Sequence, residues 1–167
     1  MSVLIQQQDN RRVFIDTLCE LAEGDERVVL IVPDVGFNYI TKFQEKFPKQ
    51  FFNFGVTEQA CILIAAGLAL SGFKPYVYSM INFVLFRPYE MIRNGIIHHQ
   101  ANVKLLGIKG SEGYKMLGFS HNLTDDDEDR RVCKNLQLDG IWPVSLEHTR
   151  QVILETYQKE KAYYIRL

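Results

Sequence analysis

Residues 27–36 read RVVLIVPDVG, a run of β-branched and leucine side chains that ends at proline, aspartate and glycine. Five consecutive apolar residues without polar alternation are typical of a strand that is buried on both faces of a sheet. Residues 11–22 precede this run and carry apolar side chains at helical spacing. The segment therefore predicts a helix followed by a buried strand, the repeating unit of an α/β fold.

The alternation of helix and strand continues to the end of the sequence. Further helices are predicted over residues 37–47, 57–70, 83–98 and 146–157, and further strands over residues 51–54, 76–78, 103–108, 141–144 and 162–167. Ser145 is a suitable N-cap for the last helix, and the polar, glycine-containing residues 110–125 are predicted to be a loop. We therefore expect one domain over residues 1–167, a doubly wound, mainly parallel sheet with helices on both faces.

The composition excludes several classes of protein. The 19 lysines and arginines and 20 acidic residues are scattered and give a net charge of −1, which argues against nucleic acid as a partner. The longest apolar run, near residues 60–70, is too short to span a bilayer, which argues against a membrane protein. Three cysteines without CxxC spacing, Cys19, Cys61 and Cys133, suit small buried side chains in a reducing compartment. These features predict a cytoplasmic protein.

Glu58 is the first candidate for chemistry, in the stretch FGVTEQ at residues 54–59. It follows Thr57, a good N-cap, so one interpretation is a carboxylate that stabilises a helix N-terminus through the helix dipole. The other is a carboxyl group held among apolar neighbours, where it could exchange a proton with a ligand nitrogen. The residues alone favour the first interpretation.

Phe83, Phe86 and Tyr89 are the second feature, because they recur every three residues along one flank of a predicted helix. Such a stripe is more often part of a core or a subunit interface than of a cofactor pocket. The neighbouring pair Arg87 and Pro88 is unusual, since proline is costly inside a helix unless it lies in the first turn or at a kink. We expect the aromatic stretch at a helix start facing a cavity.

Several motifs in order resemble the pyrimidine-binding domain of the transketolase family. They are FNFGVTEQ at residues 52–59, AAGLA at residues 65–69 and GFKP at residues 72–75. The resemblance extends over nearly the whole chain, from Arg11 through VPDVG at residues 32–36 to AYYIRL at residues 162–167. It implies the thiamine diphosphate-binding fold in its pyrimidine-domain form.

The resemblance implies a cofactor role for five residues. Glu58 would hydrogen-bond the ring nitrogen of the aminopyrimidine and favour the imino tautomer, which removes the C2 proton of the thiazolium ring. Phe83, Phe86 and Tyr89 would surround the pyrimidine ring, where stacking contacts favour aromatic side chains. Asp34 would lie close to the cofactor, and the alternative for it is an ordinary turn aspartate before Gly36.

The resemblance also implies substrate-binding roles for His121 and Arg11. His121 matches a histidine that reaches the substrate and the covalent cofactor intermediate, although a lone loop histidine is usually only solvated. Arg11 stands at the position of an arginine that binds substrate phosphate, but Asn38 replaces the serine that usually assists it. Leu117 replaces an acidic residue, four positions before His121, that contacts the hydroxyl group of an aldose acceptor. Recognition of an ordinary aldose phosphate therefore does not follow from the resemblance.

The motif that holds magnesium and diphosphate in this class, Gly-Asp-Gly followed by asparagine, is absent from the sequence. The resemblance therefore implies a small subunit without the diphosphate-binding and C-terminal domains, and no metal ligands are assigned to it. A partner subunit would hold the magnesium and the diphosphate. We expect a heterotetramer of two large and two small chains, with the helices at residues 57–70 and 83–98 at the interface.

The function implied is transfer of a two-carbon ketol unit between small ketose and aldehyde substrates, in carbohydrate metabolism, with thiamine diphosphate and magnesium as cofactors. One alternative is a component of a carboligase that decarboxylates a 2-oxo acid. Another is a non-catalytic assembly subunit, although Glu58 and the three aromatic residues argue against it. His98 and His99 match no known role and are expected on a helix surface or at an interface, with metal binding as the lesser alternative. The acidic residues 125–129 are predicted to be a solvated helix start.

Overall fold

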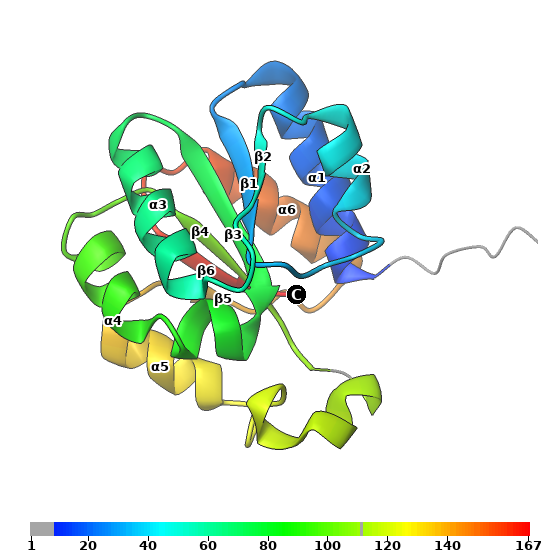
Figure 1. Ribbon diagram of the computed structural model, residues 1–167, viewed down its shortest axis with the longest axis vertical. Coiled ribbons are helices and arrows are strands. Elements are labelled where there is room, and N and C mark those ends of the chain that lie inside the picture. Colours follow the sequence, from blue (N-terminus) through cyan, green and yellow to red (C-terminus); the bar gives the residue numbers. More distant parts are fainter. Residues whose placement is uncertain (1–8, 111) are drawn as a thin grey trace, which may run out of the picture.

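A sheet of six parallel strands forms the centre of the protein (Figure 1). The computed structural model describes residues 9–110 and 112–167. Within these residues the strand order is β2-β1-β3-β4-β6-β5. The strands are β1 Val28–Val32, β2 Phe51–Asn53, β3 Lys74–Met80, β4 Lys104–Ile108, β5 Gly140–Ile141 and β6 Tyr163–Arg166. The predicted doubly wound α/β fold is confirmed, and every strand pair is parallel.

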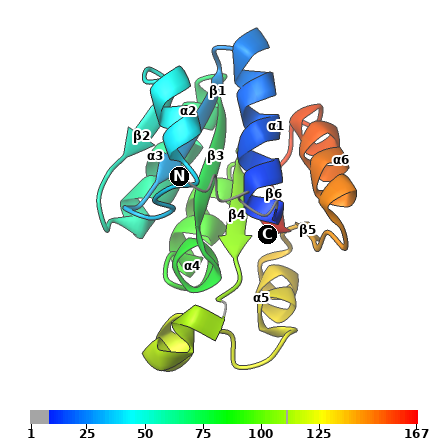
Figure 2. The same ribbon diagram turned by 90° about the vertical axis from the view of Figure 1, so that its right-hand side faces the viewer.

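Helices cover both faces of this sheet, as predicted. The α-helices are α1 Asn10–Gly24, α2 Thr41–Lys46, α3 Glu58–Leu70, α4 Tyr89–Met91, α5 Glu128–Leu136 and α6 Leu146–Tyr157. On one face α1 packs beside α6 and α2 (Figure 2), while α3, α4 and α5 cover the other face. Successive residues of β1 point to opposite faces, so Leu30 belongs to one apolar cluster and Ile31 to the other. The strand is therefore buried along its whole length.

The ends of two helices follow from local sequence. Ser145 Oγ accepts a hydrogen bond from the backbone nitrogen of His148 at 3.1 Å, so the predicted N-cap of α6 is confirmed. The helix predicted over residues 37–47 is shorter in the structure, because α2 begins only at Thr41. Gly36 and Asn38, with φ angles of 89° and 69°, hold the preceding residues in a turn.

The aromatic segment forms one irregular helical run. It consists of η1 Asn82–Phe86, α4, and η2 Ile92–Ile97, and both η segments are π-helical. The wide turn closes with a hydrogen bond from the Arg87 nitrogen to the Asn82 oxygen at 2.9 Å. Pro88, which has no amide hydrogen, lies within the run with ψ at 28°. Phe83 therefore lies in the first turn, as expected, while the proline marks an interruption farther along.

The prediction of a loop over residues 110–125 is wrong for most of its length. Residues Glu112–Ser120 form η3, a 3-10 helix with a kink at Gly118, where φ is 63°. The Asn122 amide donates to the backbone oxygens of Tyr114 and Gly118, and Asn82 donates to that of Phe119. The contacts of Asn122 lie within the segment, and the contact of Asn82 joins it to η1, which is distant in sequence. Together they hold the segment in a lobe that projects from the domain (Figures 1 and 2). Residue 111 lies outside the described residues.

The predicted solvated helix start over the acidic residues 125–129 is confirmed for residues 125–127, which are exposed just before α5, and is wrong for Asp129. Asp125 is exposed and pairs with Arg131 at 2.6 Å, but Asp129 is fully buried in the first turn of α5. Its carboxylate accepts hydrogen bonds from Tyr164 and Arg166, both at 2.7 Å, and from Trp142 at 3.0 Å. These donors come from β6 and the residue after β5, so Asp129 joins α5 to the edge of the sheet.

All three cysteines are buried free thiols, as predicted. Burial raises the pKa of Cys19 and Cys61, and it raises the pKa of Cys133 to about 12. Across residues 9–110 and 112–167, each helix is either too short or too polar to cross a membrane.

We expect Asp129→Ala to destabilise the protein by about 3–5 kcal/mol, because it leaves the largely buried Arg166 without its carboxylate partner. Chemical denaturation with the wild type alongside measures this change in the free energy of unfolding. The matched control is Asp139→Ala, which removes an exposed ion pair with Lys161 and should change the free energy of unfolding much less, because water screens exposed charges. Equal losses in the two variants would contradict the role assigned to Asp129.

Candidate active site

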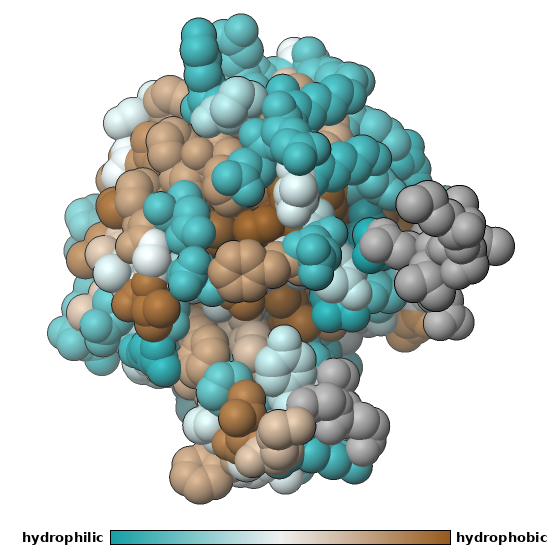
Figure 3. Space-filling view, turned by 45° about the vertical axis from the view of Figure 1, so that its right-hand side comes forward, coloured by the Kyte–Doolittle hydropathy of each residue, from teal (hydrophilic) through white to brown (hydrophobic). Residues whose placement is uncertain are grey.

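The principal cavity at the carboxyl end of the sheet has a volume of about 540 Å³. Its walls come from the segments that follow β1, β2, β3 and β4, because parallel strands bring their carboxyl ends to one edge. The chain reverses its direction of sheet growth between β1 and β3, and such a switch point leaves a crevice outside the strand ends. Figure 3 shows apolar side chains at a hollow between the body of the domain and the lobe below it.

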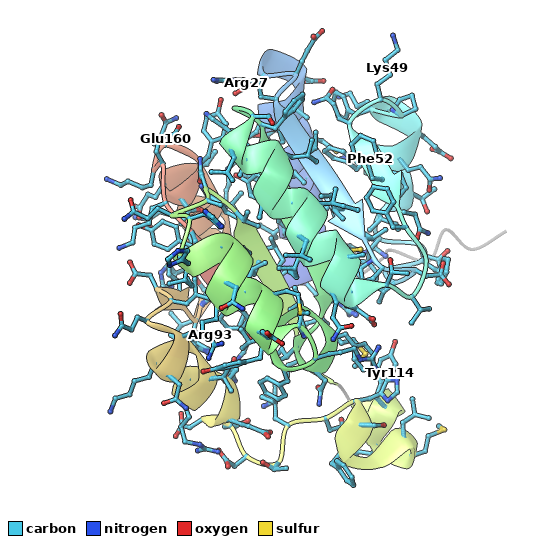
Figure 4. All side chains as sticks on the ribbon, turned by 60° about the vertical axis from the view of Figure 1, so that its left-hand side comes forward. Arg27, Lys49, Phe52, Arg93, Tyr114 and Glu160 are labelled. Carbon is cyan, nitrogen blue, oxygen red and sulfur yellow. The ribbon has the colours of Figure 1, made fainter. Side chains whose placement is uncertain are left out.

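The residues that precede the strands and the residues of η3 lie at opposite ends of the molecule. Arg27, Lys49 and Glu160 precede strands and are spread across the upper part of the molecule in Figure 4. Tyr114 in η3 lies at the opposite end, where it helps to line the cavity. The lobe formed by η3 therefore extends the wall of the cavity beyond the sheet.

Glu58 opens helix α3 at the wall of the cavity and is 5% exposed. Its Oε1 accepts a hydrogen bond from Arg87 Nη1 at 2.6 Å, across 29 residues of sequence. Thr57 does not cap the helix with its side chain and instead donates to the Phe54 oxygen. Glu58 thus has the first-turn position of a dipole-stabilising carboxylate and also the burial and cavity position that a binding role requires.

The three predicted aromatic residues separate in the structure. Phe83 lines the cavity, and its ring lies under the Arg87 guanidinium, with the guanidinium carbon 4.3 Å from the ring centroid. Phe86 and Tyr89 are partly buried and pack against the apolar cluster on the α3 face of the sheet. The interrupted, widened helical turns explain this, because residues three apart no longer fall on a single flank of a regular α-helix.

His121 also reaches the cavity, although it follows η3 in the projecting lobe. Its ring meets Phe83 edge to face with centroids 5.0 Å apart and lies parallel to Tyr114 at 6.3 Å. Ser120 Oγ lies 2.8 Å from His121 Nδ1, so Nε2 is the ring nitrogen left for a bound molecule. Leu117, in the same lobe, is 46% exposed and is not among the cavity walls.

Asp34 follows β1 at the rim of the cavity with a positive φ of 54°. Its backbone nitrogen donates to Asn53 Oδ1 at 3.1 Å, and Asn53 Nδ2 donates back to Asp34 Oδ1 at 3.3 Å. Gly36 is required beside it, because a Cβ atom there would lie 2.6 Å from the Tyr78 ring. The turn therefore joins the ends of β1 and β2 while it exposes the carboxylate of Asp34.

Arg11 lines the cavity from the start of α1, but its charge is already paired. Its Nη2 lies 2.6 Å from Asp9 Oδ2, and its guanidinium lies over the Tyr39 ring at 4.1 Å. Tyr39 also donates to Asp9 at 2.8 Å. Burial raises the pKa of Asp9, but hydrogen bonds from Arg11, Tyr39 and the Arg12 nitrogen outweigh burial and hold it below its ordinary value.

The sequence pattern does not identify Tyr78 and Arg87 as site residues, although both line the cavity. Tyr78 is among the residues that line the cavity and is fully buried, and its hydroxyl group makes no hydrogen bond within the described residues. Its strand pattern gives no sign of this role. The signal for Arg87 is its spacing of four from Phe83, which places both side chains on one helix face.

These side chains fit a flat, nitrogen-containing ring. Phe83 offers an aromatic face, Glu58 a buried carboxylate acceptor, and Tyr78 an unpaired hydroxyl group. Among residues 9–110 and 112–167 no group of three or more His, Cys, Asp or Glu side chains could hold a metal ion. His98 and His99 are exposed neighbours with ring centroids 5.2 Å apart.

Comparison with known proteins gives a consistent result. Residues 6–167 match the family model described as transketolase, pyrimidine binding domain. The chain is 31% identical over 94% of its length to a subunit of apulose-4-phosphate transketolase from Phocaeicola vulgatus. It is 34% identical, over 84% of its length, to 1-deoxy-D-xylulose-5-phosphate synthase from Desulfitobacterium hafniense.

The fold also matches a solved structure described as a split gene transketolase, inactive beta4 tetramer. The TM-score is 0.82 and the sequence identity 29%, with 95% of this chain and 50% of that chain covered. The chain spans 50% of the apulose-4-phosphate transketolase relative and 25% of the synthase.

We expect Arg11→Met to raise the pKa of Asp9, because the variant loses the hydrogen bond and charge of Arg11 while burial remains. A carbon-13 NMR titration of the Asp9 carboxyl group measures this. Since the folded-state pKa of Asp9 lies below 3.8, its stabilising effect is present at neutral pH and lost on acidification through that pKa.

The control for this titration is Arg12→Met, because Arg12 donates to Asp9 through its backbone nitrogen, which the substitution retains. The titration midpoint of Asp9 should then stay close to that of the wild type. An unchanged midpoint in Arg11→Met would contradict the ion pair.

Proposed function

The chain belongs to the transketolase pyrimidine-binding domain family, and from this premise we propose that it forms the aminopyrimidine half of a thiamine diphosphate site. The observation that carries the proposal is the buried Glu58 carboxylate beside the Phe83 ring in a cavity at the switch point of the sheet. An acceptor group next to an aromatic face suits a flat ring with a basic nitrogen. The proposed reaction of the assembled enzyme is transfer of a two-carbon ketol unit.

In this proposal the side chains of the chain bind and orient the pyrimidine ring. Glu58 hydrogen-bonds the ring nitrogen and holds a proton there, since its burial leaves water little access to the carboxyl group. Phe83 stacks on the pyrimidine ring. Phe86 and Tyr89 pack against the core and so support the helical run that contains Phe83. Asp34 lies at the rim of the cavity. When bound, thiamine diphosphate supplies the base and the carbanion sink of the reaction.

His121 and Arg11 are the proposed substrate-binding residues for a small ketose or aldehyde. His121 can present Nε2 to a hydroxyl or carbonyl oxygen, because Nδ1 faces Ser120. Arg11 reaches a substrate as one half of an ion pair with Asp9, which weakens its attraction for a phosphate group. The ion pair therefore agrees with Asn38 and Leu117, which depart from the family pattern and also argue against an ordinary aldose phosphate as the substrate.

We propose that a partner subunit with the diphosphate-binding domain holds magnesium and diphosphate, in a heterotetramer. The described residues offer no metal site, and one relative is itself named as a subunit of a transketolase. Helix α3 suits the interface, because it is apolar on its outer face as well as on its buried face. Its exposed Leu63 and Leu70, and Phe73 beyond its end, are 49%, 60% and 37% exposed. Cytoplasmic carbohydrate metabolism is the setting proposed for this complex.

A carboligase that decarboxylates a 2-oxo acid is the second candidate function, and the similarity to a synthase favours keeping it. Release of carbon dioxide from pyruvate by the assembled complex would favour this candidate, whereas turnover of a ketose donor would favour ketol transfer. A non-catalytic assembly subunit is the third candidate. It would retain the fold and the interface but would not need Glu58.

Thiamine diphosphate with magnesium should bind the co-purified complex and not this chain alone, as measured by titration calorimetry. Glu58→Gln should weaken this binding and lower turnover of the complex by about 10²–10⁴-fold, the usual contribution of acid-base groups. The matched control is Glu147→Gln, which changes another first-turn glutamate, in α6, and should leave binding unchanged.

Tight binding to the isolated chain would show that the partner is not needed. Full activity in an assembled Glu58→Gln complex would sink the catalytic assignment and leave the assembly role as the better interpretation. Equal small effects of the two substitutions would show that Glu58 only stabilises its helix.

The double variant Leu63→Glu and Leu70→Glu should prevent co-purification with the partner, because two carboxylates would be buried in an apolar interface. Val144→Glu is the control, since Val144 is 88% exposed and lies before α6, away from the outer face of α3. Circular dichroism of each isolated chain checks folding. Normal assembly of the double variant would remove α3 from the interface.

A further inference from the structure

The guanidinium group of Arg87 occupies a defined place in the cavity. Nη1 donates to Glu58 Oε1 at 2.6 Å, and the guanidinium carbon lies 4.3 Å from the centroid of the Phe83 ring. His121 meets the same Phe83 ring edge to face at 5.0 Å. A planar, delocalised cation is thus stacked on the aromatic wall and hydrogen-bonded to the buried carboxylate.

These two contacts are the ones that the proposed function assigns to the pyrimidine ring. Both groups are flat and both would use the face of Phe83 and an oxygen of Glu58, so they compete for one place. We infer that Arg87 is a built-in competitor that sets the affinity of the site for the cofactor, an inference that rests on the proposed function. Cofactor binding then requires the guanidinium to leave Glu58.

The surroundings of Arg87 allow this exchange. Its side chain is 44% exposed, whereas Glu58 is 5% exposed, so the guanidinium can return to water while the carboxylate stays in place. Arg87 also follows the π-helical segment η1 and precedes Pro88, where ψ departs from the helical value. The exposed part of the Arg87 side chain gives the guanidinium a route into solvent.

The ion pair of Arg87 with Glu58 also gives the buried carboxylate a hydrogen-bond donor before the cofactor binds. A buried carboxylate without a partner is costly, and Arg87 is the hydrogen-bond donor that the described residues provide to Glu58. The apparent affinity for the cofactor falls by the fraction of molecules in which the site is open. Removal of the guanidinium should therefore tighten binding, whereas a residue that helps to bind the cofactor would show the opposite effect.

The test is titration calorimetry of thiamine diphosphate with magnesium into the co-purified complex of Arg87→Gln and of the wild type. We expect Arg87→Gln to bind about tenfold more tightly, which corresponds to a site that is open in about one molecule in ten. Arg87→Lys should lie between the two, because lysine can pair with Glu58 but offers no flat group to Phe83. Arg93→Gln, an exposed arginine in η2 of the same helical run (Figure 4), is the matched control and should bind as the wild type does.

Each result decides the matter. Unchanged or weaker binding by Arg87→Gln, with a wild-type complex that binds, overturns the competitor role and leaves the proposed function intact. No binding by the wild-type complex overturns the proposed function itself, and this inference with it. If both Arg87 variants fail to assemble while Arg93→Gln assembles, Arg87 serves folding or assembly and the competitor role is refuted.

Discussion

Burial of the parallel sheet on both faces is the constraint on which the rest of the structure depends. β1 and β3 are buried along their whole lengths, so their backbone groups must be paired within the sheet. Helices then have to cover each face, and the loops that connect them meet at the carboxyl ends of the strands. The cavity lies there because the sheet grows in opposite directions from β1 and β3.

Two buried carboxylates, Asp129 and Glu58, differ in how many hydrogen-bond donors surround them. Asp129 is surrounded by donors from three side chains, which leaves its oxygens little capacity for another partner. Glu58 has one side-chain donor, Arg87, and that donor is itself partly in water. The first arrangement locks α5 to the sheet, and the second keeps a buried acceptor that can change its partner.

Two irregular helical segments, η1 and η3, contribute side chains to the wall of the cavity. The π-helical η1 follows β3 and the kinked η3 follows β4 at the carboxyl edge, whereas the π-helical η2 precedes β4. The wide turns direct Phe83 into the cavity and Phe86 toward the core, and the Asn82 amide holds η3 against the helical run. Regular helices could not separate these neighbouring side chains in this way.

The resemblance to a known family, and not apolar periodicity, implied that Glu58 and Phe83 lie at a cofactor site. The sequence by itself determined the order of helices and strands and the parallel sheet, because apolar periodicity is a local property. It did not reveal the buried position of Asp129, the helical turns of η3 or the contact of Arg87 with Glu58. Each of these depends on residues far apart in the chain, 37 residues for Asp129 and Arg166 and 29 for Arg87 and Glu58. Only tertiary packing decided them, since burial and the choice of hydrogen-bond partner exist only once distant segments meet.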